Sequence, residues 1–419
     1  MSLSPLSAAE NGEEDAKTTA VDLNDNSAAG GCGAAGEGGG GLTVEISDAL
    51  SEKETVKFTI RTRARRFHEY AEGETKVERE HDEFVWLHWA IEDNAAYRGY
   101  IIPPAPPRPD FEVSREKLHR LGEGEQTMTK EEFEKMKAEL EAEYLATFKK
   151  TVAVHEVFLC RLAAHPVFAK DHSLKVFLQY EGELSVRAPS TKEKAQSFWK
   201  RFTQSADETV MLSNQKDVDE FFEHERAYLD EYYERISQTT SKSDRVCRQH
   251  KAMADTYIKA ADILEKMAAA EQDASLRQVL AKVSETFEKS RKLESRVATD
   301  LDLKQSDTFR YFMKDTKAAK DLLYRRLRAL ADYEAANKNL ERARAKNKEV
   351  EKAEQEQQAA CASFESITGV AKEELLDLKQ RRVVSFKKNL VGLAELQAKH
   401  AKAHLQLLGQ AVDALKHVD

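Results

Sequence analysis

Proline and glycine are nearly missing from the second half of this chain. From Thr191 to Asp419 there is no proline, and the three glycines are Gly369, Gly392 and Gly409. Inside a helix, proline costs roughly 3 kcal/mol and glycine about 1 kcal/mol, so this region has few places where a helix must end. The absence predicts a few very long helices, of the kind that serve shape and pairing.

Three further absences narrow the function classes. No run approaches the roughly eighteen apolar residues that span a bilayer, and the N-terminus lacks the charged and then apolar pattern of a signal peptide. The cysteines Cys32, Cys160, Cys247 and Cys361 lie far apart and form no paired metal spacing, as in proteins of a reducing compartment. These absences predict a cytoplasmic protein with free thiols.

Patterns for catalysis, metal binding and nucleotide binding are also absent. His400 and His404 lie four residues apart, yet no third metal ligand is placed nearby and no HExxH pattern occurs. The glycines at 38–41 lack the lysine and the flanking strand of a phosphate loop. We therefore expect solvated histidines, no cofactor, no metal, no nucleic acid partner and no enzymatic activity.

The formal net charge of -9 is concentrated in residues 1–41, where seven acids face one lysine. This segment contributes -6 to the net charge and the rest of the chain only -3. A basic patch that faces a membrane is therefore compatible with the charge of residues 42–419. The segment also holds nine glycines and no aromatic residue, so it cannot bury enough apolar surface to offset its chain entropy. Residues 1–41 are predicted to be a disordered tail.

An α+β domain is predicted over residues 42–182. Alternating apolar residues at 42–46 and 56–60 predict two strands joined by a turn near Glu52 and Lys53, and a third strand is expected at 75–79. Asp82 is placed to cap the next helix. The buried side of that helix should hold Phe84, Trp86, Leu87 and Ile91.

A proline-rich segment, Ile101–Phe111, cannot form a helix or a central strand and should run extended as polyproline II. Beyond it, Thr129 and Glu132 form a capping box that opens a helix with apolar residues at spacings of three and four. This helix should continue or restart until Pro166. A helical insertion is thus predicted at about residues 112–150.

Residues 183–212 are predicted to be a linker with an amphipathic helix, and residues 213–419 to be an all-α domain of three helices. Breaks are expected near Glu271–Ala274 and near Ser363–Gly369. Helices of about sixty residues would be on the order of 90 Å long, and such a rod buries its seams best by folding back and by dimerising. The seams hold apolar residues at coiled-coil spacing, among them Phe222, Leu229, Ile236, Leu323, Leu327, Leu330, Phe386, Leu390 and Leu407.

Several longer motifs stand out: Phe84–His88, Ile101–Phe111, Leu121–Glu125, Met128–Phe133, Glu139–Ala146 and Ala318–Arg326. Together they resemble the sorting nexins that join a phox-homology (PX) domain to a BAR domain. The resemblance is to the branch of sorting nexins 5, 6 and 32, and within it most closely to sorting nexin 32, and it covers about residues 42–419. It implies a PX domain with a helical insertion, followed by a three-helix BAR domain.

In most PX domains, an Arg-Arg-aromatic stretch at the end of the third strand binds the 3-phosphate of a phosphoinositide. The matching stretch here is Arg79-Glu80-His81. Glu80 places a negative charge where a phosphate ligand is expected, so a phosphate would meet repulsion. We therefore expect no ordinary recognition of phosphatidylinositol 3-phosphate by this domain.

The resemblance implies instead that receptor tails dock as strands in a groove between the helical insertion and the sheet edge. The matching residues are Tyr144, Leu145, Phe148, Val152 and Glu156. Four of them recur every four residues and share a helical stripe, although spacing alone is more typical of core residues. Residues 61–76 are richer in arginine and glutamate than the hairpin usual in these nexins, which predicts a different tail or weaker binding on that side.

Two basic segments are candidates for membrane contact. In residues 192–212 an apolar side is flanked by cations, as an interfacial helix requires; its members are Phe198, Trp199, Lys200, Arg201 and Phe202. Between Lys320 and Lys348, nine cations face four acids, and on a curved BAR dimer each would contribute about 1 kcal/mol near anionic lipid. These candidates are Arg325, Arg326, Arg328, Arg342, Arg344, Lys346 and Lys348.

The resemblance implies a cytoplasmic protein that is peripheral on early endosomes and their tubules. It would recognise the tails of transmembrane receptors, such as mannose 6-phosphate receptors, through its PX domain. With a partner of nexin 1 or 2 type it would shape anionic endosomal membrane as a BAR dimer, for endosome-to-Golgi or recycling transport. The alternative is a coiled-coil cytoskeletal or signalling scaffold, because Pro103-Pro104-Ala105-Pro106-Pro107-Arg108 fits a PxxPxR ligand of SH3 domains.

Overall fold

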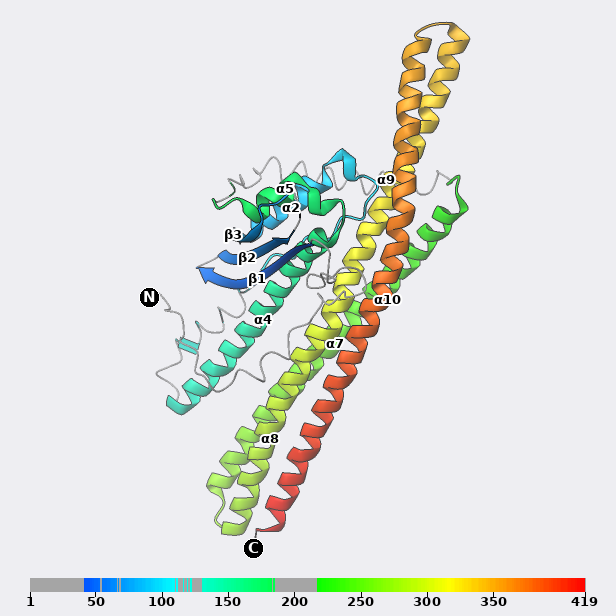
Figure 1. The fold of residues 1–419 in the computed structure, drawn as a ribbon. Coiled ribbons are helices and arrows are strands. Elements are labelled where there is room, and N and C mark those ends of the chain that lie inside the picture. Colours follow the sequence, from blue (N-terminus) through cyan, green and yellow to red (C-terminus); the bar gives the residue numbers. More distant parts are fainter. Residues whose placement is uncertain are drawn as a thin grey trace.

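The computed structural model describes residues 41–52, 55–65, 67, 69–109, 111, 116, 119, 121–122, 130–182, 184 and 217–418. Figure 1 shows a small domain that joins a sheet to helices, resting against a long rod of helices. The predicted order, an α+β domain followed by an all-α domain, is confirmed.

The sheet is antiparallel and its strand order is β1-β2-β3, with β1 at Gly41–Glu52, β2 at Thr55–Arg65 and β3 at Gly73–Glu80. All three predicted strands are confirmed. In β2, Ile60 lies opposite Ile46 and Val77, and all three side chains are buried on one face. The other face is charged, and there Arg63 Nε donates to Glu74 at 2.9 Å. Arg61 and Arg63 therefore pair across strands with Glu45 and Glu74.

Helix α2, His81–Glu92, begins earlier than the sequence predicts. Its N-cap is Glu80 and not Asp82, because Glu80 and Glu83 form a reciprocal capping box in which the Glu80 N–H donates to Glu83 Oε2 at 2.6 Å. This pair satisfies two backbone N–H groups that the first turn leaves free. Asp82 lies in the first turn, where a carboxylate is stabilised by the helix dipole. Helix α5, His172–Gln179, packs against the same core.

The proline-rich segment contains no helix or strand over the described residues 101–109, as predicted. Helix α4 follows as one unbroken helix, Lys130–Ala164, that ends just before Pro166. Its C-terminal half packs into the small domain through Phe158, Leu159 and Leu162, whereas Figure 1 shows its N-terminal half projecting beyond the sheet. The expected capping residue Thr129 lies outside the described residues.

The rod consists of α7 (Glu220–Ala270), α8 (Ala274–Leu301), α9 (Asp307–Lys346) and α10 (Val350–Lys416). A π-helical turn, Asp302–Ser306, joins α8 to α9, so the rod has three long helical segments as predicted. In Figure 1 the α7–α8 hairpin and the C-terminus lie at one end, and the α9–α10 hairpin projects at the other.

One of the two predicted helix breaks is confirmed and the other is wrong. Residues 271–273 separate α7 from α8, but α10 runs unbroken through Ser363–Gly369, and the second break lies at residues 347–349. Asn347 and Glu349 have φ values of 50° and 53°, so the chain reverses through the left-handed region, which asparagine tolerates better than most residues. One interior glycine, Gly369, costs only about 1 kcal/mol, too little to end so long a helix.

The small domain is joined to the rod by buried contacts. Ile101 packs in one apolar cluster with residues of α7, α9 and α10. Its backbone N–H donates to Glu374 of α10 at 3.1 Å, and the same carboxylate lies 3.1 Å from His165 Nε2. Arg161 of α4 lies 3.2 Å from the fully buried Asp315 of α9. These contacts fix one part of the chain against the other.

Candidate functional site

The groove residues expected from the resemblance lie on the part of α4 that leaves the core of the small domain. Tyr144, Phe148 and Val152 are partly buried and pack against the edge of that core. The ring centroids of Tyr144 and Phe148 are 6.3 Å apart, and Phe111 lies 5.3 Å from Tyr144 and 6.1 Å from Phe148. These three rings form an aromatic wall built from two segments of the chain.

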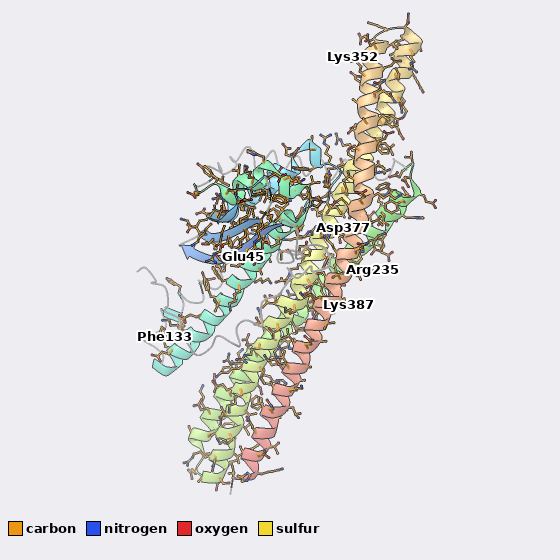
Figure 2. The ribbon with its side chains drawn as sticks, viewed as in Figure 1. Glu45, Phe133, Arg235, Lys352, Asp377 and Lys387 are labelled. Carbon is orange, nitrogen blue, oxygen red and sulfur yellow. The ribbon has the colours of Figure 1, made fainter. Side chains whose placement is uncertain are left out.

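Leu145 and Glu156 flank the wall. Leu145 is 50% exposed, and Glu156 is partly buried one turn beyond Val152. In Figure 2 the projecting half of α4 runs from Phe133 toward the sheet, where Glu45 of β1 is labelled. The structure therefore places the stripe at the boundary of the core and not inside it.

Strand β1 is an edge strand next to α4. Within the described residues β1 pairs with β2 alone, and α4 approaches it closely enough for the Cys160 thiol to donate to the Val44 carbonyl at 3.4 Å. An extended peptide can add to such an edge by main-chain hydrogen bonds while alternate side chains contact a neighbouring apolar surface. The aromatic wall supplies a surface of that kind.

His155, which no motif in the sequence marks, fixes α4 against the sheet. Its ring stacks on Phe58 at 4.3 Å and meets Phe84 edge-on at 4.8 Å. Burial lowers the pKa of His155 to about 3, so the imidazole is neutral. Since Nδ1 lies 2.7 Å from the Thr151 carbonyl it must donate, and Nε2 accepts from His81 Nδ1 at 3.0 Å. No local sequence signal predicts this pair, because the two histidines lie 74 residues apart.

Arg79 begins the stretch that matches the phosphate-binding motif, yet it is buried inside the domain. Its Nε donates to the Phe177 carbonyl at 2.9 Å, and its terminal nitrogens donate to the carbonyls of Glu78, Tyr180 and Gly182. Burial lowers the pKa of Arg79, and the nearby Glu83 opposes that shift. Because Glu80 caps α2 and Arg79 bonds backbone carbonyls, both side chains of this stretch stabilise the fold.

The cations expected to contact membrane do not form one surface. Arg326 is buried: it pairs with Asp217, donates to Thr368 Oγ1 at 3.1 Å and lies 3.6 Å over the Phe222 ring. The prediction that Arg326 contacts membrane is wrong for this conformation, because the rod encloses its guanidinium. The sequence could have predicted this burial, since Arg326 follows the seam residue Leu323 by three positions and therefore lies on the same face of the helix.

Arg325 serves the contact between the two parts of the chain. It donates to the carbonyls of Arg98 and Tyr100 at 3.0 Å and 2.7 Å. Arg328 is exposed, and four further cations are exposed near the α9–α10 hairpin, where Figure 2 labels Lys352. Those four are Arg342, Arg344, Lys346 and Lys348. The expected interfacial residues Phe198, Trp199, Lys200, Arg201 and Phe202 lie outside the described residues.

The SH3-ligand interpretation of the proline-rich segment is wrong for the folded chain. Pro103 and Pro106, the two prolines of the PxxPxR pattern, are both buried, and only Pro107 and Arg108 are exposed. An SH3 domain binds the exposed ridge of a polyproline helix, so it could not reach these prolines without unfolding the segment. The prolines instead shape the path that leads to Phe111.

His400 is not solvated, in contrast to the prediction, because its Nε2 lies 2.7 Å from Asp300. The His404 side chain is 39% exposed, and its Nε2 lies 3.7 Å from Glu294. In the described ranges, no group of three or more His, Cys, Asp or Glu side chains is arranged to hold a metal ion. No described helix is long and apolar enough to cross a membrane.

Helix α10 bears an exposed apolar stripe. Leu376, Val383 and Leu390 recur every seven residues, and the exposed fraction reaches 68% at Val383. Sequence periodicity predicts Leu390 in a buried seam, but it is half exposed in this single chain. The stripe continues through Val384, Val391, Leu405, Leu408 and Val412. A heptad stripe of this length is typical of a helix that pairs with another helix.

Comparisons with known proteins agree with both parts of the fold. The PX domain family matches residues 68–181, and the family described as "Vps5 C terminal like" matches residues 195–409. Sorting nexin-6 of Mus musculus is 55% identical over 374 residues, which cover 89% of this chain and 91% of that protein. Sorting nexin-32 of Homo sapiens is 55% identical over 382 residues, which cover 91% of this chain and 94% of that protein.

A solved structure shows a similar fold at low identity. The cryo-EM structure of the SNX-BAR Mvp1 tetramer matches with a TM-score of 0.52 and 15% sequence identity, over 88% of this chain and 99% of that chain. At this identity the likeness concerns the fold alone.

Proposed function

Because the chain belongs to the PX-BAR sorting nexins, on the branch of sorting nexins 5, 6 and 32, we propose that its PX domain recognises the cytoplasmic tails of transmembrane receptors. The family consists of non-catalytic adaptors that act in membrane trafficking and membrane shaping, form dimers and bind membranes. The proposed cargo is of the mannose 6-phosphate receptor type. The proposed route is endosome-to-Golgi or recycling transport from early endosomes, with a partner of nexin 1 or 2 type.

The observation that supports this proposal most is the position of the aromatic wall beside an edge strand. Tyr144 and Phe148 are partly buried at the domain boundary, where they contact the buried Phe111, and β1 has one neighbour among the described strands. A tail that adds to β1 gains main-chain hydrogen bonds from the strand and contact area from the rings. Val152 and Leu145 extend this surface along α4.

The hydrogen bonds of Arg79 also support this proposal, because the arginine already donates to backbone carbonyls and is not available to a lipid phosphate. A PX domain without a free arginine at this place has lost its usual phosphate ligand. Membrane attachment then falls to the BAR part, through the exposed cations of the α9–α10 hairpin and the proposed interfacial residues 198–202. The nexin 1 or 2 type partner would add lipid recognition.

We expect Phe148→Asp to weaken tail binding at least about 30-fold, because a carboxylate in the aromatic wall removes ring contact and opposes burial. The measurement is calorimetric titration of a synthetic mannose 6-phosphate receptor tail into the full chain. The matched control is Lys149→Asp, an exposed neighbour on α4 whose larger charge change should alter affinity less than about threefold. Equal affinity of wild type and Phe148→Asp would show that the tail binds elsewhere.

A further inference from the structure

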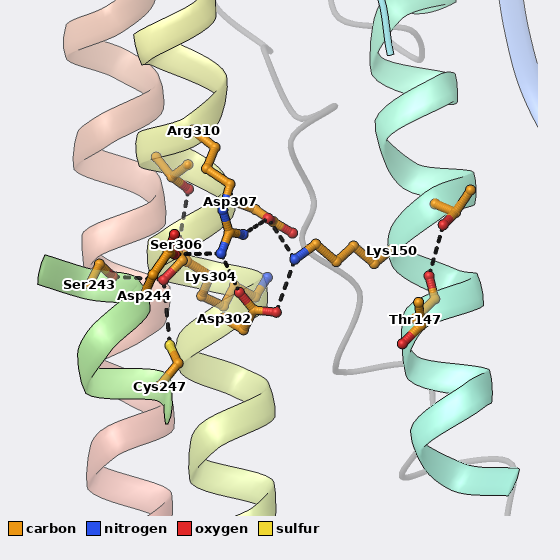
Figure 3. Close-up of polar contacts among 12 residues, drawn as sticks. Thr147, Lys150, Ser243, Asp244, Cys247, Asp302, Lys304, Ser306, Asp307 and Arg310 are labelled. Carbon is orange, nitrogen blue, oxygen red and sulfur yellow. Dashed lines mark hydrogen bonds and ion pairs between the residues drawn. The ribbon is translucent and has the colours of Figure 1, made fainter. Parts of the chain in front are cut away.

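Lys150 lies on the face of α4 opposite the aromatic wall. It is two residues from Phe148 and two from Val152, and two residues correspond to about 200° around a helix. Its Nζ reaches across to the rod and lies 2.9 Å from both Asp302 Oδ2 and Asp307 Oδ1. Figure 3 shows this lysine joining α4 to the two aspartates. One helix therefore presents the proposed tail site on one side and a contact with the rod on the other.

The two aspartates bracket the π-helical turn between α8 and α9. The backbone N–H of Asp307 donates to the carbonyl of Asp302, which is the hydrogen bond that defines the turn. In a regular α-helix, residues five apart point about 140° away from each other. The wider π turn brings both carboxylates to one side, so one ammonium group can contact both.

Three carboxylates at this turn share one guanidinium of the rod. Arg310 pairs with Asp244 of α7, Asp302 and Asp307. Lys150 of the small domain adds a second cation in direct contact with Asp302 and Asp307. Burial raises the pKa of Asp307, whereas at Asp302 Lys150 and Arg310 outweigh burial and lower the pKa. The small domain thus supplies a cation that stabilises the ionised form at the turn.

The turn is also in contact with α7. Ser306 Oγ lies 2.7 Å from Ser243 Oγ and 3.4 Å from Cys247 Sγ, and all three side chains are buried. A change between π and α geometry would rotate Ser306 away from α7 and separate Asp302 from Asp307. Single π turns inside helices are rare and often lie at functional sites, and this one packs against α7 and α10.

We propose that Lys150 is a positioning residue that links tail binding at the aromatic wall to the π turn of the rod. The inference rests on the proposed function, because it concerns the regulation of the same site. When a tail fixes the projecting half of α4, Lys150 is held between Asp302 and Asp307 and the π turn is stabilised. Conversely, a rod with an intact π turn holds α4 in the position that the tail requires, since coupling between sites is reciprocal.

The test is residue-resolved amide hydrogen exchange at residues 302–307 in the full chain, for wild type, Lys150→Gln and the control Lys149→Gln. Without tail, exchange in Lys150→Gln should be at least about threefold faster than in the other two proteins, because the turn loses its bridging cation. With saturating mannose 6-phosphate receptor tail, exchange should slow in wild type and Lys149→Gln and stay unchanged in Lys150→Gln. Tail affinity should fall about fivefold in Lys150→Gln.

The arm without tail tests the contact between Lys150 and the turn. Equal exchange at 302–307 in wild type and Lys150→Gln would overturn the inference, whatever the tail does. A tail that binds wild type and leaves exchange at 302–307 unaltered would also overturn it, while the proposed function would stand. Faster exchange in Lys150→Gln together with no tail binding to wild type would leave the contact between Lys150 and the turn in place, but would reject the proposed function and, with it, the coupling to the tail.

Discussion

Replacing Arg79 with methionine is expected to unfold the PX domain under conditions in which the wild type is stable. Methionine keeps part of the side-chain volume but has no donors, so the buried carbonyl of Phe177 and the partly buried carbonyls of Tyr180 and Gly182 would lose their partner. Each orphaned group costs about 1–3 kcal/mol, and Glu83 would also lose the cation 3.9 Å away. We expect a loss of at least about 4 kcal/mol in the free energy of unfolding.

The measurement is urea unfolding followed by tryptophan fluorescence in a Trp199→Phe background, so that the signal comes from Trp86 and Trp89 of α2. Arg63→Met is the control: Arg63 is exposed and pairs only at the surface with Glu45 and Glu74, so its loss should cost less than about 1 kcal/mol. If Arg79→Met were as stable as wild type and had lost binding to vesicles with phosphatidylinositol 3-phosphate, Arg79 would be a lipid ligand and the structural role would be rejected.

Leu390→Asp is expected to weaken BAR dimerisation at least about 100-fold. Leu390 is half exposed in the single chain, so the fold should tolerate a polar side chain there. In a dimer that covers the α10 stripe, the substitution replaces a buried leucine by a buried carboxylate. A symmetric dimer carries this substitution in both protomers, so its free-energy cost is counted twice. A loss of about 3 kcal/mol corresponds to that factor.

Sedimentation equilibrium of the chain alone, and of its mixture with a nexin 1 type partner, measures this effect. Gln410→Asp is the matched control, since Gln410 is exposed on the same helix outside the stripe, and its association should equal that of wild type. Unaltered association of Leu390→Asp in both experiments would show that the α10 stripe lies outside the dimer interface.

The elements that the sequence predicts well are those set by local periodicity. Alternation places β1 and β2, and proline excludes helix from residues 101–109. The wrong break at Ser363–Gly369 has a local cause, because one glycine in a long helix costs less than the helix gains. The turn lies instead at Asn347 and Glu349, whose backbones are left-handed. Residues other than glycine predict this backbone conformation only weakly.

The functional contacts depend on residues that lie far apart in the chain. Lys150 and Asp302 are separated by 152 positions, so no window of sequence brings them together. A count of charges along the sequence places Arg326 among the surface cations, because the residues that bury it lie far away in the chain. The aromatic stripe at Tyr144 and Phe148 is more typical of a core, and only its place at the end of the packed half of α4 leaves it available to a partner.

Amide exchange along β1, measured with and without saturating receptor tail, tests the central claim most directly. If the tail adds as a strand against the aromatic wall, those β1 amides that face away from β2 should exchange at least about tenfold more slowly in the complex. Amides that already bond to β2 should change little. A tail that binds with measurable affinity and leaves β1 exchange unaltered would contradict strand addition, and with it the assignment of this site.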